Sequence, residues 1–414
     1  MPTARSTEAG GILLTPQVSR KGMSLSQDAW RRLRKNRVAM ISLVAIVSIC
    51  ILAFLTPLLP LQAPDHAQTA LQYEEPTISP FWLPTKPLDM ELVSQTPQVV
   101  AHLETELTDL KLRYELAKQS GENLDNARRQ LRRKEAEIQD TIQAPYRQLG
   151  YPSLGMLSRA MVRARFALFG NQCINSLCGR DLLGRDLLSR LFWGARISLL
   201  VGLVATIVSL VIGVNYGAIS GYCGGWIDDA MMRFVDVLYS VPFIFVVIFL
   251  LTILGEDSIA DELAYWGINR ITVFFLVVGA IYWLTMSRVV RGQVISLKHE
   301  LFVEAARSLA ASQSRIIFLH LLPNLLSVVL VYLTLTIPRV MLFEAFLSFL
   351  GLGVEPPDVS WGLLANEGIK VITPVKIYWW LILFPSLALG ATLLALNFLG
   401  DGVRDALDPR LRDA

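Results

Sequence analysis

Residues 302–324 read FVEAARSLAASQSRIIFLHLLPN and separate two long apolar runs. Glu304 and Arg307 place charges inside this stretch. Between residues 301 and 310, four apolar residues recur at the i, i+3, i+4, i+7 spacing of one helical face, namely Phe302, Ala305, Ala306 and Leu309. The stretch therefore predicts an amphipathic helix of about three turns, which is too short and too charged to cross a bilayer.

The composition of the whole chain indicates a membrane protein. Of its 414 residues, 53% are hydrophobic and 18% are charged, whereas soluble domains carry about a quarter of charged residues. A membrane-spanning helix needs roughly 20 consecutive apolar residues. Six runs approach that length and predict an all-α protein with six transmembrane helices: Val38–Leu61, Ile197–Tyr216, Val235–Leu254, Ile271–Val290, Leu325–Phe343 and Tyr378–Leu399.

The basic residues predict on which side of the membrane each loop lies. They cluster in the leader, residues 1–37, and in the loop 288–315, whereas the segment 255–270 has only Arg270. The first run is too long for a cleavable signal peptide and serves as an anchor. The N-terminus, the loop 288–315 and the tail 401–414 are therefore expected in the cytosol. We interpret the net charge of +3 as this topology signal and expect no nucleic-acid partner.

Residues 62–196 form a long insertion that this topology places outside the membrane. Its prolines favour an extended path over residues 62–97 and exclude a long helix there. From about 100 to 142, apolar residues follow helical spacing on both sides of Ser120-Gly121-Glu122-Asn123, namely Leu103, Leu107, Leu110, Tyr114 and Ala117, then Leu124, Ala127, Leu131 and Ile138. This pattern predicts a helical hairpin. A charge-rich solvated helix or a disordered spacer is the alternative interpretation.

A second amphipathic stretch follows the hairpin at residues 156–166. Its apolar residues alternate with Arg159, Arg163 and Arg165. Each arginine costs roughly 2.5 to 3.5 kcal/mol at the bilayer centre, so the stretch does not span the membrane. The pattern is typical of a helix that lies in the membrane interface.

The sequence contains no motif of a catalytic or metal site. A G-x-x-x-x-G-K-[ST] phosphate loop, an H-E-x-x-H zinc motif and a G-x-S-x-G elbow are all missing. Its four histidines, His66, His102, His299 and His320, are dispersed without ligand spacing. We therefore expect that the chain is not an enzyme and binds no metal or cofactor of its own.

Two cysteines, Cys173 and Cys178, lie five residues apart in the segment expected outside the membrane. Thiols at this spacing in an oxidising compartment can close a disulfide. Whether they do depends on the geometry of their Cα and Cβ atoms, so a disulfide and two free thiols both stay open.

The stretch 301–323 has two interpretations. It could be an interfacial helix that rests on the headgroups. It also resembles the EAA loop of ABC-importer permeases, on the match of Glu304, Ala305, Ala306, Leu322 and Pro323. Ala310 stands where that family usually has glycine, and His320 where it often has isoleucine.

Four further stretches are similar to the oligopeptide and dipeptide permeases, specifically to the OppC-like or DppC-like member of the pair. They are GRDLLSRLFWGARISLLVG at 184–202, AISGYCGGWIDDAMMR at 218–233, EAFLSFLGLGVEPPDVSWG at 344–362 and NFLGDGVRDALDPR at 397–410. The insertion is the departure from this family, whose segment here is usually much shorter.

The resemblance implies the type I importer permease fold, with a core permease domain at 197–400, in a prokaryotic inner membrane. It implies a permease for peptides that works with a second, OppB-like or DppB-like permease, two ABC ATPase subunits that use ATP and Mg, and an extracytoplasmic peptide-binding protein. It also implies that residues 301–323 form a cytosolic coupling helix against an ATPase. The residues expected to couple are Glu304, Ala305, Ala306, Arg307, Leu309, Ala310, His320 and Pro323.

A peptide pathway needs some polar lining because peptides are polar and zwitterionic. Arg339 and Glu344, in the fifth predicted crossing, are the candidates. The alternative is an interfacial arginine and glutamate that pair with each other or reach toward the headgroups. Two alternative functions also remain: a permease for another small solute, such as a nickel chelate or glutathione, and a membrane scaffold whose hairpin recruits a partner.

Overall fold

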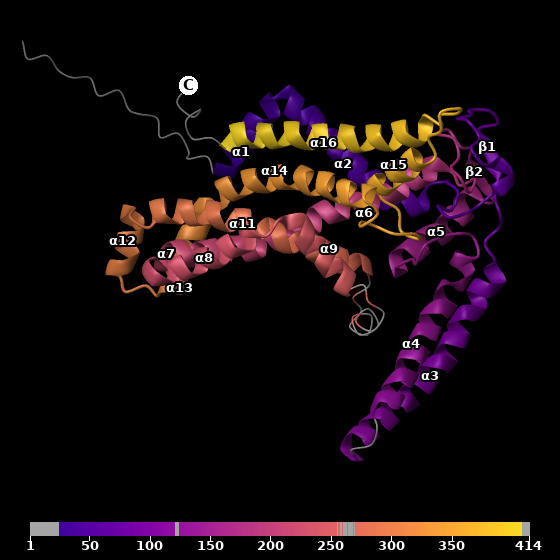
Figure 1. The fold of residues 1–414 in the computed structure, drawn as a ribbon, viewed down its shortest axis with the longest axis horizontal. Coiled ribbons are helices and arrows are strands. Elements are labelled where there is room, and N and C mark those ends of the chain that lie inside the picture. Colours follow the sequence, from indigo (N-terminus) through magenta and orange to yellow (C-terminus); the bar gives the residue numbers. More distant parts are fainter. Residues whose placement is uncertain are drawn as a thin grey trace, which may run out of the picture.

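The structure is a computed structural model that describes residues 25–120, 124–254 and 270–407, together with Glu256, Ile259, Leu263 and Ile268. Most of these residues are helical (Figure 1). The α-helices are α1 (Leu25–Lys35), α2 (Arg37–Leu55), α3 (Met90–Ser120), α4 (Leu124–Arg147), α5 (Met156–Phe169), α6 (Leu187–Val208), α7 (Val214–Cys223), α8 (Gly225–Ser240), α9 (Phe243–Leu254), α11 (Arg270–Leu297), α12 (Leu301–Ser308), α13 (Gln313–Arg315), α14 (Leu322–Phe349), α15 (Trp361–Lys370) and α16 (Trp380–Leu407).

Short elements connect these helices. Two are 3₁₀ turns, η1 (Thr56–Leu58) and η2 (Thr69–Leu71), and two are π-helical segments, η3 (Ser209–Gly213) and η4 (Ile316–Leu321). Two strands, β1 (Trp82–Pro84) and β2 (Gln172–Ile174), pair antiparallel with Leu83 opposite Cys173. The strands join the two ends of the long insertion.

The fold class predicted from the apolar runs, an all-α membrane protein, is confirmed. Within the described residues, five helical segments are long and apolar enough to cross a membrane: Arg37–Leu58, Leu187–Cys223, Thr272–Leu297, Gln313–Phe349 and Trp380–Leu407. The bent pair α8 and α9 passes the same test only when its helices are taken together, which gives six crossings.

The third predicted crossing, Val235–Leu254, is not one helix. Its first residues end α8, its last residues form α9, and the two helices meet at an angle of 83°. Pro242 accounts for the break, because proline has no N–H and disfavours the helical conformation of the residue before it. Val241 is accordingly extended, at φ −84° and ψ 124°.

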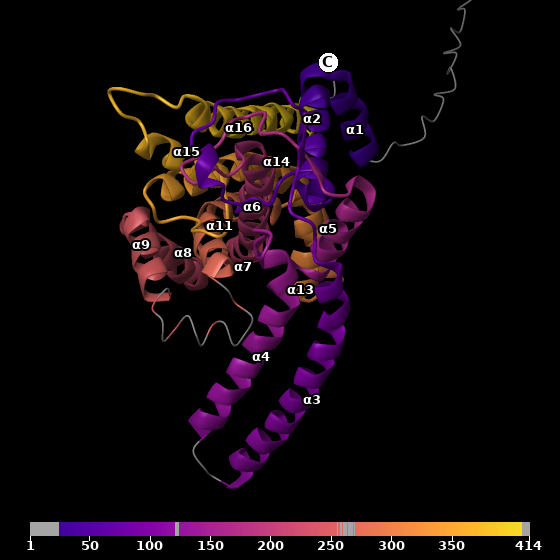
Figure 2. The ribbon, with the colours of Figure 1, turned by 90° about the vertical axis from the view of Figure 1, so that its right-hand side faces the viewer.

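The long helices of the bundle, α6, α11, α14 and α16, run along the long axis of the molecule, so the bundle has two distinct ends (Figure 1). One end, called the α12 end, holds α12, α1 and the last turns of α16. The buried side chains of Leu33, Ala39 and Ala406 hold α1 and α2 against α16 there. The other end, called the hairpin end, holds β1, β2, α5 and α15 (Figure 1). Viewed from this hairpin end, α3 and α4 extend away to one side of the bundle (Figure 2).

The predicted hairpin is present and is longer than the residues 100–142 suggested. Leu103 on α3 and both Leu131 and Ile138 on α4 are buried between the two helices, as their spacing predicted. The extended path predicted for residues 62–97 is confirmed up to residue 89, where only η2 and β1 form, but the exclusion of a long helix is wrong for the residues after it. α3 begins at Met90 and contains Pro97, whose missing N–H gives up one hydrogen bond that the rest of the 31-residue helix outweighs.

Of the two states left open for Cys173 and Cys178, the structure has the two free thiols. Both are buried, but they belong to different surroundings. Cys173 lies on β2 and donates its thiol hydrogen to the carbonyl of Leu83 at 3.3 Å. Cys178 packs beside Trp380 at the start of α16. Burial raises the pKa of the Cys178 thiol to about 12, which keeps it protonated and unreactive.

Three parts of the sequence prediction lie wholly or largely outside the described residues. They are residues 1–24 of the basic leader, most of the segment 255–270, and residues 408–414 of the tail.

Candidate coupling surface

Helix α12 is the first part of the stretch 301–323, and it is shorter than predicted. Glu300 precedes it in an extended conformation, Glu304 lies in its first turn and Arg307 in its last, which suits the helix dipole. The helix ends at Ser308, and α13 and η4 then lead into α14. The expectation of a single coupling helix over residues 301–323 is therefore corrected to a short helix, a turn and the beginning of a long membrane helix.

The turn after α12 explains this break. Ala310 has a φ of +55°, in the left-handed region that favours glycine. The amide of Ala310 donates to the carbonyl of Arg307 at 2.9 Å, and the amide of Ala311 donates to Ala306 at 3.1 Å. These two bonds define a Schellman motif, which normally places glycine where Ala310 stands. A tight turn therefore follows the helix even though the glycine is missing.

Replacing Ala310 by glycine is expected to stabilise the protein by about 1 kcal/mol, because glycine adopts the left-handed conformation without a Cβ clash. In a chain of this size that corresponds to a rise of about 1 °C in the unfolding midpoint. Ala310→Val should lower the midpoint, since a β-branched side chain is still less compatible with positive φ. Thermal unfolding of the purified variants in one detergent measures both. A glycine variant less stable than wild type would contradict the expectation.

The buried face of α12 is not the one predicted. Val303 is fully buried and Ala306 nearly so, three residues apart, and they join a hydrophobic cluster with Val294 of α11 and Ile317 of η4. The prediction assumed that Phe302, Ala305, Ala306 and Leu309 form the apolar face. Of these four residues only Ala306 is buried, because the helix packs sideways onto α11 and η4.

The other apolar residues of α12 are left on the surface. Leu301 is 81% exposed and Leu309 is 84% exposed, and Phe302 is also exposed beside them. Glu304, Ala305 and Arg307 are exposed as well. We call Leu301, Phe302, Ala305 and Leu309 the docking face. Apolar side chains that lie exposed next to one another, and not singly, mark a surface that contacts a protein or a membrane.

An ion-pair network fixes the helices that support α12. Arg291 of α11 donates two hydrogen bonds to the Asp228 carboxylate of α8, both at 2.6 Å. Ser220 of α7 also donates to Asp228. Lys298 donates to the Gly221 carbonyl at 3.1 Å. These contacts tie the α7–α8 connection to α11.

Arg307 links α12 itself to this network. Its guanidinium carbon lies 5.4 Å from the centre of the Tyr222 ring on α7, which is within the range of a cation–π contact. In addition, α7 packs closely against α11, because glycines at 213, 217 and 221 leave no room for a side chain between the helices. A displacement of α12 would therefore be passed to α7, α8 and α11.

The remaining predicted coupling residues lie away from the docking face. His320 is half-buried in η4, where its carbonyl accepts a hydrogen bond from Asn324 at 2.6 Å. Pro323 is exposed in the first turn of α14, a position where the missing N–H costs nothing. Their positions indicate a role in shaping the entry into α14 rather than in contacting a partner through α12.

The two candidate pathway residues are not brought together. Arg339 is exposed on α14, whereas Glu344 is completely buried. The Glu344 carboxylate accepts hydrogen bonds from Ser348 at 2.8 Å and from Ser198 of α6 at 3.4 Å. Glu344 therefore joins α14 to α6 inside the chain and does not line a surface, while Arg339 keeps the exposure that a pathway residue needs.

A polar cluster at the hairpin end was missed by the sequence analysis. It is built on a tandem repeat, GRDLL at 179–183 and again at 184–188, followed by Ser189 and Arg190. Asp181 accepts the amides of Leu183 and Arg185, and Asp186 accepts those of Leu188 and Ser189. The second aspartate thereby caps α6. The repeat of charged residues with period five was the signal that could have identified it.

The two arginines of this repeat and Arg190, which follows it, form hydrogen bonds with acids and amides far away in the chain. Arg180 donates to Glu74 at 2.9 Å and to Gln62 at 3.2 Å. Arg185 donates to Asp181 at 2.7 Å and to Asp65 at 3.3 Å. Burial raises the pKa of Asp65 despite this contact with Arg185.

Arg190, the last of the three, is 1% exposed at its side chain and holds α6 to α15. It donates to Asp181 at 2.7 Å and to both carboxylate oxygens of Glu367, at 2.5 and 3.2 Å. The cluster therefore fastens the insertion, α6 and α15 together. Its buried charges are paired, as charges taken out of water must be.

No group of three or more His, Cys, Asp or Glu residues that could hold a metal is found in the described part of the chain.

Two family models match the chain on either side of the hairpin. Residues 213–413 match the binding-protein-dependent transport system inner membrane component, and residues 24–76 match the N-terminal transmembrane domain of oligopeptide transport permease C. The chain is also 42% identical over 223 residues to the oligopeptide transport system permease protein OppC of Bacillus subtilis, covering 54% of this chain and 68% of that protein. The chain belongs to this permease family.

Two other members of the permease family also match the chain. The chain is 47% identical over 219 residues to OppC of Haemophilus influenzae and 44% identical over 224 residues to the dipeptide transport system permease protein DppC of Bacillus subtilis. These matches cover 53% and 54% of this chain, and the chain spans 65% of the length of each of these two relatives. A solved structure of the MetNI methionine ABC transporter in inward-facing conformations aligns with 53% of this chain and 96% of its own, at a TM-score of 0.39 and 16% identity.

Proposed function

We propose that the chain is the transmembrane permease subunit of an ATP-driven peptide importer and forms half of its translocation pathway. The observation that carries the proposal is the docking face of α12, with Leu301 and Leu309 more than four-fifths exposed on a helix that is held by Arg307 and Val303 against the bundle. The peptide substrate is supported by the names of the relatives, which are oligopeptide and dipeptide permeases.

The proposal includes partners. A second, OppB-like or DppB-like permease completes the pathway, and an extracytoplasmic binding protein delivers the peptide. Two ABC ATPase subunits bind and hydrolyse ATP with Mg, and one of them receives the docking face of α12, with the exposed Glu304, Arg307 and Ala310 beside it. In this arrangement the α12 end faces the cytosol and the hairpin end faces outward, as the basic residues of the leader and of the loop 288–315 predict.

The packing around α12 supports a mechanism of coupling. When ATP closes the ATPase subunits, they would displace α12. Val303 and Ala306 carry that displacement into the cluster with Val294 and Ile317, and the Asp228–Arg291 pair carries it into α8. Close-packed helices move as units rather than deform. The displacement would therefore reach the membrane helices that line the pathway, where Arg339 is the exposed polar candidate.

Two alternatives are distinguished from this proposal by experiment. A permease for a nickel chelate or for glutathione would use the same coupling surface with another substrate. A membrane scaffold would retain the hairpin but would need no docking of an ATPase.

Reconstitution of the chain with its partner permease, ATPases and binding protein in vesicles tests the function. We expect ATP hydrolysis to rise when the peptide-loaded binding protein is added, together with uptake of labelled peptide. Uptake of glutathione or nickel chelate without peptide uptake would show that this solute, and not a peptide, is the substrate. Failure of the ATPases to co-purify with the chain would favour the scaffold and overturn the proposal.

A further inference from the structure

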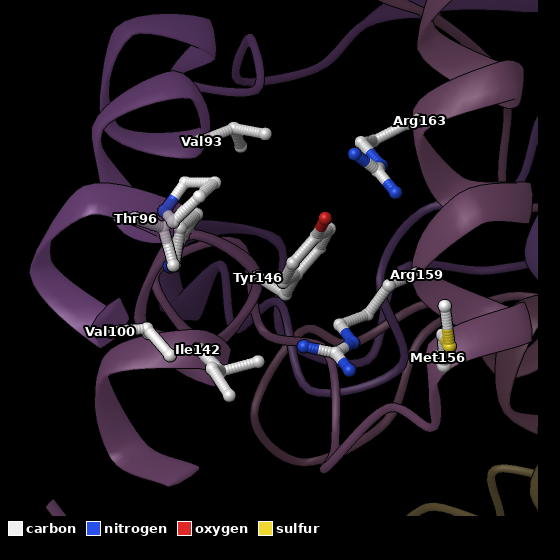
Figure 3. Close-up of a pocket in the computed structure, with 10 residues that line it drawn as sticks. Val93, Thr96, Val100, Ile142, Tyr146, Met156, Arg159 and Arg163 are labelled. Carbon is white, nitrogen blue, oxygen red and sulfur yellow. The ribbon is translucent and has the colours of Figure 1, made fainter. Parts of the chain in front are cut away.

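A cavity of about 240 Å³ lies between the base of the hairpin and α5. The hairpin contributes mainly apolar side chains to it, and α5 contributes Arg159 and Arg163. In Figure 3 the side chains of these two arginines and of Tyr146 extend into the space between the helices. The remaining lining residues are Val93, Thr96, Pro97, Val100, Ile142, Pro145 and Met156.

The two arginines of the cavity have no counterion among the residues that the structure describes; Arg159 is half-buried, and Arg163 is exposed at the rim of the cavity. No acidic residue lines the cavity. Within the described parts of the chain, neither Arg159 nor Arg163 forms a salt bridge, whereas the nearby Arg147 pairs with Asp140 at 3.0 Å. Two like charges that share one recess repel each other unless an anion lies between them. The cavity is therefore electrostatically prepared for a negative ligand.

The donors of the cavity fit a phosphate. Two guanidinium groups present forked N–H donors that match phosphate oxygens, and the Tyr146 hydroxyl adds a third donor group. Burial raises the pKa of Tyr146, although both arginines lower it, so its hydroxyl keeps its proton at neutral pH. A phosphate diester carries one negative charge on two nonbridging oxygens, which these donors can satisfy together. The apolar walls, including Val100, suit a ligand whose remainder is hydrocarbon.

The position of α5 indicates where such a ligand comes from. α5 contacts η1, which ends the first membrane-spanning segment, Arg37–Leu58. It is joined to α6 by the hydrogen bond from Arg196 to Ser158 at 3.1 Å. Its own surface exposes Met156 at 83% and Leu168 at 70%. An amphipathic helix at the end of a span lies at the level of the lipid headgroups.

We propose that this cavity binds the phosphate of an anionic phospholipid headgroup, held by Arg159, Arg163 and Tyr146. The arginines belong to α5, whereas Tyr146 and Thr96 belong to the hairpin. The bound phosphate therefore bridges the membrane surface and the hairpin and sets the angle at which the hairpin leaves the bundle. A soluble phosphate ester has the same headgroup chemistry without the acyl chains, and the experiment separates the two.

Native mass spectrometry of the purified full chain in detergent tests this site. The chain is titrated with phosphatidylglycerol or with phosphatidylcholine, and in a parallel arm with sn-glycerol 1-phosphate by calorimetry. The double variant Arg159→Gln/Arg163→Gln should bind phosphatidylglycerol about tenfold or more weakly, because it loses the charge-assisted hydrogen bonds. The control Arg113→Gln/Arg147→Gln removes the same charge from exposed arginines of the hairpin and should bind like wild type.

The outcomes distinguish a phospholipid headgroup from a soluble phosphate ester as the source of the bound phosphate. Tight binding of phosphatidylglycerol that depends on Arg159 and Arg163, with weak binding of phosphatidylcholine and of glycerol phosphate, supports the lipid site. Glycerol phosphate that binds as tightly as the lipid, with the same dependence on the arginines, overturns the membrane source in favour of a soluble phosphate ester. Equal binding of phosphatidylglycerol by wild type, double variant and control overturns the site.

Discussion

Replacing Leu309 by aspartate should abolish ATP-driven transport and leave the chain folded. Leu309 is 84% exposed, so the substitution removes no packing within the chain, and its own stability should change by less than about 0.5 kcal/mol. In the docked complex, however, the carboxylate would be buried in an apolar groove without a partner, which costs several kcal/mol. We expect the ATPase to bind at least about 100-fold more weakly. Co-purification of the ATPase and peptide uptake in vesicles measure the effect.

The same substitution elsewhere provides the matched control. Leu112→Asp, on the hairpin, changes a leucine that is 60% exposed and should keep ATPase association and uptake. Glu304→Lys is a second variant of α12, at an exposed residue beside the docking face, since it reverses a charge and should weaken docking through unfavourable electrostatics. If Leu309→Asp co-purified with the ATPase and transported peptide like wild type, α12 would not be the coupling element.

Replacing Arg190 by methionine should destabilise the protein by about 3 to 5 kcal/mol, the usual cost of removing one partner of a buried ion pair. The substitution leaves the Asp181 carboxylate with only Arg185, and leaves Glu367 without its bidentate contact to α6. Because Glu367 lies on α15, the ion pair between α6 and α15 is lost, and the hydrogen bonds from Trp361 to Ser198 and Leu191 remain. We expect a sharp fall in the unfolding midpoint and in the yield of folded protein, measured by fluorescence-detected thermal unfolding in detergent.

Two further variants distinguish the stability lost with the buried Arg190–Glu367 pair from the effect of removing any positive charge. Arg113→Met removes an exposed arginine that pairs with Asp109 and should cost less than about 1 kcal/mol. Arg190→Lys should recover only part of the stability, since lysine cannot form the bidentate contact to Glu367. An Arg190→Met variant as stable as Arg113→Met would show that the cluster does not hold the fold together.

Local patterns predicted most elements of the fold. Runs of about 20 apolar residues located the membrane helices, and the spacing of Leu103, Leu131 and Ile138 located the hairpin, because burial in lipid or in a two-helix seam depends on neighbouring residues. The prediction was wrong at two prolines, because whether a proline ends a helix depends on the structure around it. Pro242 breaks a predicted span, yet Pro97 is accommodated inside a long helix.

The stretch 301–323 shows, within one helix, the same difference between what local sequence predicts and what tertiary packing decides. Its sequence predicted a short amphipathic helix, but not which side of it is buried. Phe302 and Leu309 are more apolar than Ala306, yet Ala306 is buried because α12 meets η4 and α11 from that side. The angle between helices depends on the turn at Ala310, whose left-handed conformation alanine does not signal.

By itself, therefore, the sequence determined a helical membrane protein with a charged hairpin and a short helix between spans, since these follow from hydrophobicity and periodicity over a few turns. Only the tertiary structure decided which charges meet. Arg190 pairs with Glu367, 177 residues away, and Arg159 and Arg163 face Tyr146 across a cavity. No local pattern encodes such contacts, because they depend on how distant helices cross and on where each buried charge finds a partner.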